Sequence, residues 1–138
     1  MFMQEIIAII RQNCINQVKK SLVEAGFYSI TATRAIGRGR RPVESELLQV
    51  VNEDPDIGTE LLPTLSQGGR LFPKRLVYLV VPEDRKQEAV DILMQCCRTG
   101  ESGDGKIFVL PVKEALRLRT KEKNEQAIDE MRSPKEVS

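Results

Sequence analysis

Arg75-Leu76-Val77-Tyr78-Leu79-Val80-Val81 is an apolar run, rich in valine and leucine, that Pro82 brings to an end. Residues of this kind favour a buried β-strand. A helical pattern follows over about residues 84–98, and Gly100 ends it. Another strand is predicted at residues 106–110. The predicted helix carries an apolar face made by Ala89, Val90, Leu93 and Cys97.

The N-terminal part of the chain repeats this alternation. Residues 5–10 form a short β-branched run, and a second strand is predicted over about residues 28–36. Between them lies a helix that Asn13 or Asn16 can cap and that Gly26 ends. Its apolar face is made by Ile15, Val18, Leu22 and Ala25.

The predicted order of elements is strand, helix, strand, strand, helix, strand. This is the order of an α+β, ferredoxin-like βαββαβ sandwich, in which both helices cover one face of an antiparallel sheet. The apolar strand at residues 77–81 implies that the other face is covered as well. Self-association is the simplest way to cover it.

Length and charge are those of one globular domain without a general affinity for nucleic acid. The chain has 138 residues, and its 21 basic and 20 acidic side chains leave a formal net charge of +1. There is no apolar run long enough for a membrane span and no leader-like start, so we expect a cytoplasmic protein. Histidine is absent, and Cys14, Cys96 and Cys97 form neither a zinc motif nor a disulfide framework. We predict no protein metal site and three reduced thiols.

Two stretches fall outside the regular pattern. From Pro42 to Leu71 the periodicity is weak, and a connection of this length is typical of function or disorder. Residues 116–119 are expected to extend the sheet and to close a domain spanning residues 1–120. Residues 121–138 alternate charges around Ala127, Ile128 and Met131, which predicts a mobile or partly helical tail.

Gly103-Asp104-Gly105-Lys106, at the start of the last strand, is the strongest candidate site. Glycines let backbone amides approach phosphate oxygens closely, and a lysine adds positive charge. Arg117 and Arg119 alternate in a segment expected to be extended, so their guanidinium groups would share a face and suit a polyphosphate. Taken alone, an Asp-Gly pair is more often a plain turn, and Arg-x-Arg is more often a solvated face.

Taken together, these motifs resemble a known family. The stretch from Gly103 to Val109, followed at the right distance by Arg117-Leu118-Arg119-Thr120, closely resembles the C-terminal signature of the PII signal-transduction proteins. Further similar segments lie in order along the chain, and the likeness covers residues 5–120 except the loop. These segments are Ile7-Ala8-Ile9-Ile10-Arg11, Thr31, Gly37-Arg38-Gly39-Arg40, Phe72-Pro73-Lys74 and Val80-Val81-Pro82.

The resemblance implies a trimer that binds ATP or ADP in the cleft between neighbouring subunits. One wall of that cleft would be formed by Ile9, Gly37, Gly39, Arg40, Gly103, Asp104, Gly105 and Lys106. The adjoining subunit would contribute Thr31, Val80, Arg117 and Arg119.

The resemblance also implies an effector, 2-oxoglutarate, bound beside a magnesium ion that ATP holds. Lys74 matches the lysine that pairs with a 2-oxoglutarate carboxylate. Arg41 stands where the family has a magnesium-ligating glutamine, and an arginine cannot ligate a cation. Tyr78 stands where many relatives have glutamate. We therefore assign Arg41 and Lys74 as candidate effector-binding residues.

Residues 42–71 correspond to the family's T-loop, which engages the target. This loop is longer than in general PII proteins and lacks a tyrosine that could be uridylylated. Its return, residues 63–75, resembles the second nif-cluster PII subfamily, whose members assemble with a sister PII protein and inhibit nitrogenase. A homotrimer and a mixed assembly both remain open, as does a disordered acidic insertion. The candidate partner-binding residues are Leu47, Leu48, Leu61 and Leu62.

The resulting hypothesis is a nitrogen-regulatory PII-like signalling protein, not an enzyme. It would sense adenine nucleotide and 2-oxoglutarate and regulate a target enzyme, nitrogenase, through the T-loop. The alternative is a small nucleotide-hydrolysing or metabolic enzyme on the same fold. Against that alternative, the sequence contains no histidine and no evident nucleophile with a neighbouring base.

Overall fold

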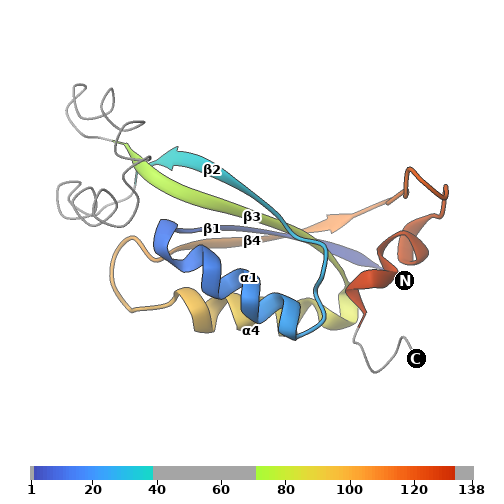
Figure 1. Ribbon diagram of the computed structural model, residues 1–138, viewed down its shortest axis with the longest axis horizontal. Coiled ribbons are helices and arrows are strands. Elements are labelled where there is room, and N and C mark those ends of the chain that lie inside the picture. Colours follow the sequence, from blue (N-terminus) through green and yellow to red (C-terminus); the bar gives the residue numbers. More distant parts are fainter. Residues whose placement is uncertain (1, 39–70, 133–138) are drawn as a thin grey trace.

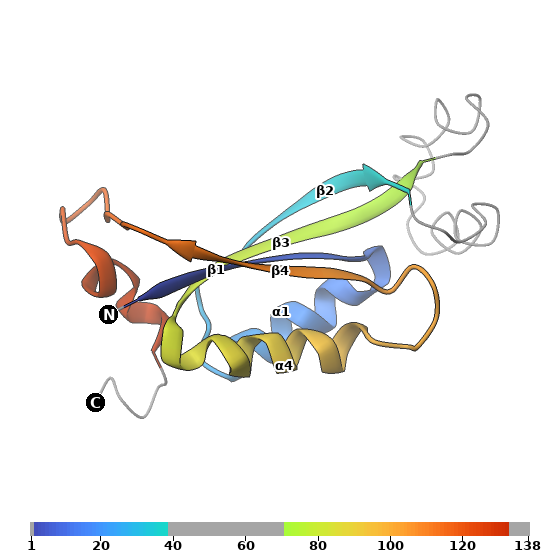
Figure 2. The same cartoon turned by 180° about the vertical axis from the view of Figure 1, so that it is seen from behind.

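The computed structural model describes residues 2–38 and 71–132. The sheet has four antiparallel strands in the order β2-β3-β1-β4. Helices α1 and α4 lie side by side on one face of it (Figures 1 and 2). The predicted α+β, ferredoxin-like sandwich is therefore confirmed. The bounds are β1 Met3–Arg11, α1 Ile15–Glu24, β2 Thr31–Gly37, β3 Phe72–Pro82, α4 Lys86–Cys97 and β4 Gly105–Val112.

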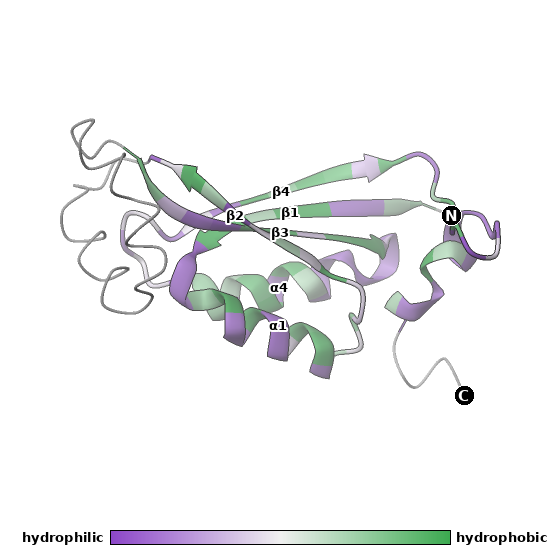
Figure 3. Ribbon diagram, turned by 45° about the horizontal axis from the view of Figure 1, so that its top comes forward, coloured by the Kyte–Doolittle hydropathy of each residue, from purple (hydrophilic) through white to green (hydrophobic). Residues whose placement is uncertain are grey.

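The core lies between the sheet and the two helices. Successive side chains of a strand point to opposite faces, so Ile6, Ala8 and Ile10 of β1 turn towards the helices and are buried. The helices pack against these side chains with apolar residues at helical spacing. Figure 3 shows long hydrophobic stretches along the central strands. The buried helix residues are Ile15, Val18 and Leu22 on α1, and Ala89, Leu93 and Cys97 on α4. These faces are the ones that the periodicity predicted.

Helix starts differ from the prediction more than helix ends. Neither Asn13 nor Asn16 caps α1; the N-cap is Cys14, and no side chain caps the helix. A 3-10 turn over Gln12–Cys14 carries the chain from β1 into the helix instead. The end is as predicted, because Gly26 adopts φ 92°, a left-handed conformation that suits glycine.

The prediction that residues 116–119 extend the sheet is wrong. After β4 the chain forms a tight hairpin in which Leu116 pairs with Lys123 in an isolated bridge. The amide of Lys121 donates to the carbonyl of Arg117 at 2.8 Å, and Lys121 itself adopts φ 64°. The alternation of Arg117 and Arg119 thus belongs to a turn and not to an extended strand.

Residues 124–131 form a 3-10 helix, η3 (Asn124–Met131), that packs against the body of the domain beside the start of β1 (Figure 1). Its three buried residues are Ala127, Ile128 and Met131, the apolar positions noted in the sequence. The buried Arg85 donates from one guanidinium nitrogen to the carbonyl of Met131 at 2.7 Å and from the other to the carbonyl of Ala25 at 2.6 Å. The sequence predicted a mobile or partly helical tail, and this part of it is helical and packed.

The sheet face opposite α1 and α4 retains large hydrophobic side chains at its surface. On the edge strand β4, the exposed fractions of Phe108 and Leu110 are 47% and 41%. Among residues 2–38 and 71–132, no helix has the length and apolar character needed to cross a membrane.

Candidate nucleotide-binding site

The backbone of Gly105 lies directly against β1. Gly105 pairs with Ile10, and Lys106 pairs with Ile9. A Cβ atom placed on Gly105 would lie 1.8 Å from the carbonyl oxygen of Ile9, and the residue has φ 114°. Only glycine satisfies both conditions. The requirement fixes the loop from Gly103 against the end of β1, and Lys106 follows it directly on β4.

Asp104 organises this loop from inside. Its carboxylate accepts hydrogen bonds from the amides of Thr99 and Gly100, at 2.8 and 2.9 Å, and from the Thr99 hydroxyl. The Arg11 guanidinium lies 3.3 Å from Oδ1 of this carboxylate. Desolvation opposes ionisation, but the bonds from Thr99 and Gly100 and the charge of Arg11 prevail and lower the Asp104 pKa to about 2. Asp104 is thus an ionised structural carboxylate already engaged within the protein.

Arg11 is a site residue whose role the sequence did not reveal. Besides Asp104, its guanidinium donates to the carbonyl oxygen of Ser102 at 3.0 Å, across 91 positions of sequence. In the sequence, Arg11 stood out only as the last residue of the first family-like segment, at the end of the β-branched run.

Lys74 joins β3 to the same loop. It is buried, with an exposed fraction of 7%, although lysine is seldom buried without a partner. Its ammonium nitrogen donates to the carbonyl oxygen of Gly103 at 3.0 Å and lies 4.6 Å from the ring centroid of Phe72. The candidate effector residue and the candidate phosphate loop therefore touch directly.

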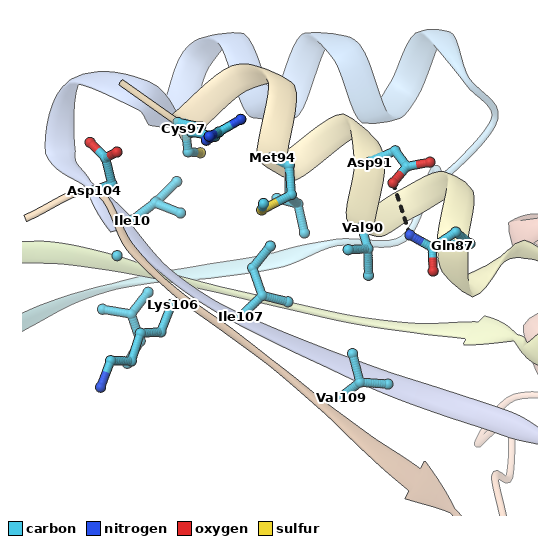
Figure 4. A pocket seen from close by; sticks show the side chains of 14 residues that line it. Ile10, Gln87, Val90, Asp91, Met94, Cys97, Asp104, Lys106, Ile107 and Val109 are labelled. Atoms are coloured by element: carbon cyan, nitrogen blue, oxygen red, sulfur yellow. Dashed lines mark hydrogen bonds between the residues drawn. The ribbon is translucent and has the colours of Figure 1, made fainter. Parts of the chain in front are cut away.

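A cavity of about 520 Å³ runs between α4 and β4 from this loop. In Figure 4, Ile107 points towards Val90 and Met94 of α4, whereas Lys106 points to the other side of the strand. The lining is largely apolar, with Asp104 and Lys106 at one end. Such a lining suits the apolar part of a ligand, while the Lys106 ammonium lies on the other side of β4.

The thiol of Cys14 lies in the same electropositive region. Its hydrogen bond with Cys97 and the charges of Arg11 and Lys74 outweigh desolvation and lower the Cys14 pKa to about 7. That hydrogen bond and burial raise the pKa of the Cys97 thiol. The three cysteines are free, as expected, but Cys14 is more than a space-filling residue.

The other candidate residues gather at the opposite end of the sheet. Thr31 pairs with Tyr78, while Gly37 pairs with Phe72 near the first group. Thr31 and Val80 line a second cavity, of about 440 Å³, together with residues of η3.

Arg117 also lies near η3, and its guanidinium contacts the carboxylates of Glu122, Asp129 and Glu130. Arg119 is exposed. A single chain thus brings Ile9, Gly37, Lys74 and the loop of residues 103–106 to one end, and Thr31, Val80 and Arg117 to the other. Seven further candidates lie outside the described residues: Gly39, Arg40, Arg41, Leu47, Leu48, Leu61 and Leu62.

Comparisons with known proteins identify the family of this chain. The profile of the family described as "Nitrogen regulatory protein P-II" matches residues 3–122. The "Nitrogen fixation nifHD region GlnB-like protein 2" of Methanobacterium ivanovii is 42% identical over 127 residues, which cover 91% of this chain and 99% of that protein. The "Nitrogen regulatory protein P-II" of Azospirillum brasilense is 36% identical, covering 91% of this chain and 100% of that protein.

A solved structure shows the same fold. The Arabidopsis thaliana PII protein, crystallised with citrate bound, superposes with a TM-score of 0.66 at 27% identity, covering 91% of this chain and 92% of that one. The family match spans nearly all of the described sheet and helices. The chain belongs to the nitrogen regulatory protein P-II family, within its nif-region GlnB-like branch.

Proposed function

We propose that this protein is a cytoplasmic signalling trimer that senses adenine nucleotide and 2-oxoglutarate and regulates a target enzyme, nitrogenase, through residues 42–71. The observation that carries the proposal is the bond between the Lys74 ammonium and the Gly103 carbonyl, 3.0 Å long. It couples the candidate effector residue to the candidate phosphate loop. A ligand on either one therefore changes the surroundings of the other.

The loop supports nucleotide binding through its backbone and charge. Gly103 and Gly105 have φ values of 96° and 114°, so the chain turns in a conformation that side chains would prevent. Lys106 follows at the exposed edge. In this proposal backbone amides and Lys106 hold the polyphosphate on the side of β4 that faces away from α4.

Magnesium would reach this site with the nucleotide. The Asp104 carboxylate is occupied by Thr99, Gly100 and Arg11, so it does not offer a free metal ligand. The nucleotide phosphates would hold the ion and thereby supply positive charge for the carboxylates of 2-oxoglutarate. Lys74 would pair with one of those carboxylates by exchanging its present carbonyl partner.

Two further features support the proposed trimer and the proposed target enzyme. Phe108 and Leu110 on the uncovered sheet face give apolar surface for trimer formation, either with like chains or with a sister protein. The relatives named for the nifHD region point to nitrogen fixation, and hence to nitrogenase as the target.

Native mass spectrometry tests the assembly and nucleotide parts of this proposal together. The wild-type protein should appear as a trimer that retains ATP. Lys106→Ala should remain trimeric and lose most of the bound ATP, because only the phosphate contact is removed. A trimer that never retains adenine nucleotide would contradict the sensing role. Rapid multiple-turnover ATP hydrolysis by the pure protein would favour the enzymatic alternative.

A further inference from the structure

The segment that follows the Arg117 hairpin is held firmly although it lies mostly beyond the family match, which ends at residue 122. Met131 of η3 is 1% exposed, and its carbonyl accepts a hydrogen bond from the buried Arg85. The Ser29 hydroxyl also donates to the Glu130 carboxylate at 2.8 Å. This docking places the acidic side chains of the segment next to Arg117.

Three carboxylates surround the Arg117 guanidinium. One terminal nitrogen contacts Glu122 at 2.9 Å, and the other contacts Asp129 at 2.6 Å and Glu130 at 2.8 Å. The second nitrogen also lies 3.3 Å from the carbonyl oxygen of Ala127. A guanidinium nitrogen of this type has two hydrogens, so its capacity is already used. A phosphate could bind the terminal nitrogens of Arg117 in bidentate fashion only by displacing these partners.

The same segment reaches the second cavity. Ile128, Glu130 and Met131 line it opposite Thr31 and Val80. Glu130 therefore contacts Arg117 and also faces the space that contains the other candidate nucleotide residues of this end. Negative charge at that wall would repel a polyphosphate as long as η3 stays docked.

We propose that Glu122, Asp129 and Glu130 act as an internal substitute for phosphate on Arg117, and that nucleotide and the docked η3 segment compete for this guanidinium. This inference rests on the proposed nucleotide-binding function. Binding of ATP transfers Arg117 from the carboxylates to the polyphosphate and loosens residues 124–131. The docked segment thereby lowers the nucleotide affinity of the nucleotide-free protein. Its release from the domain signals that nucleotide is bound.

The double variant Asp129→Asn with Glu130→Gln tests this competition, because it removes two charges and keeps side-chain size. Calorimetry should show ATP binding about ten-fold tighter or more than in the wild-type protein. The matched control is Glu24→Gln with Glu83→Gln, two exposed carboxylates outside the Arg117 cluster, and its affinity should be unchanged. Unchanged or weaker binding by the first variant would overturn the proposal. Weaker binding would mean that the carboxylates orient Arg117 for phosphate.

Hydrogen–deuterium exchange on the wild-type protein gives a second measurement that needs no substitution. Saturating ATP should speed exchange of the amides of residues 124–131, while exchange in α4 stays constant. Equal or slower exchange of that segment with ATP bound would overturn the proposal. If the wild-type protein binds no adenine nucleotide at all, the proposed function itself fails, and the competition fails with it.

Discussion

Lys74 of β3 reaches across the end of the sheet and donates a hydrogen bond to the carbonyl oxygen of Gly103, at 3.0 Å. The two residues are 29 positions apart, and β1 lies between β3 and β4, the strand that follows Gly103. Residues 38–71 separate β2 from β3, and Lys74 is the third residue of β3, just after that segment. In the proposed function, a change of partner at Lys74 would link the loop at residues 103–106 to the start of β3, which follows the proposed output segment.

The phosphate-binding assignment is tested by Lys106→Ala and Arg119→Ala. In the proposed site each would remove one charge-assisted hydrogen bond to phosphate, which typically contributes about 1.5–3 kcal/mol. ATP affinity should therefore fall by roughly ten-fold to over a hundred-fold, as measured by calorimetry. Lys113→Ala, which removes a lysine from the exposed surface beyond β4, serves as the control. An Arg119→Ala variant with wild-type ATP affinity would remove that residue from the site.

Gly105→Ala should destabilise the end of β1 as well as the loop. The new methyl group would meet the Ile9 carbonyl at 1.8 Å, and the left-handed backbone adds about 1–3 kcal/mol of strain. Thermal unfolding should show a clear fall in Tm. At Gly37 a Cβ meets no described atom within 4 Å, so Gly37→Ala should keep the wild-type Tm. Equal Tm values for both variants would contradict the close approach of Gly105 to β1.

The low pKa of Cys14 predicts selective thiol chemistry. The thiol is the less reactive form, so alkylation by iodoacetamide should rise with pH around the value of about 7 and level off above it. The raised pKa and burial of Cys97 should keep that thiol slow across the same range. Peptide mass spectrometry after timed labelling measures both rates, and Cys14→Ser should abolish the fast phase. Labelling of Cys97 as fast as Cys14 would contradict this description of the site.

Deletion of residues 46–69 tests whether regulation of the target depends on a different part of the chain from nucleotide binding. The described sheet, helices and loop at residues 103–106 do not include this segment, so trimer formation and ATP binding should stay near the wild-type level. Inhibition of nitrogenase in a reconstituted assay should be lost. A deletion variant that still inhibits its target in a ligand-dependent way would place the output elsewhere in the molecule.

Local patterns predicted much of the fold. The strands and both helices follow from residue periodicity, which reflects contacts that repeat every two or every three to four positions. The paired roles of Arg11 and Asp104 could not be read in the same way, because they join residues 93 positions apart. The glycine at position 105 is recognisable as a turn residue, but the reason for it, the Ile9 carbonyl, is visible only in three dimensions.

The C-terminal part shows where sequence reasoning fails. Alternation at Arg117 and Arg119 is typical of a strand, yet the left-handed conformations of Lys121 and Asn124 turn the chain back. The charges of the tail predicted a mobile or partly helical segment. Residues 124–131 are helical, and the buried Arg85 anchors them by donating a hydrogen bond to the Met131 carbonyl. The wrong prediction for residues 116–119 arises because tertiary contacts override weak local preferences.

Calorimetric titration of 2-oxoglutarate into the wild-type protein, with and without ATP and magnesium, tests the central claim most directly. In the proposed site the nucleotide and its metal supply part of the effector site, and Lys74 supplies the rest. 2-Oxoglutarate should therefore bind only when ATP and magnesium are present, and Lys74→Ala should abolish that binding. Equal binding with and without nucleotide would contradict the shared site. No binding under either condition would leave a sensor of adenine nucleotide alone and would contradict the effector half of the account.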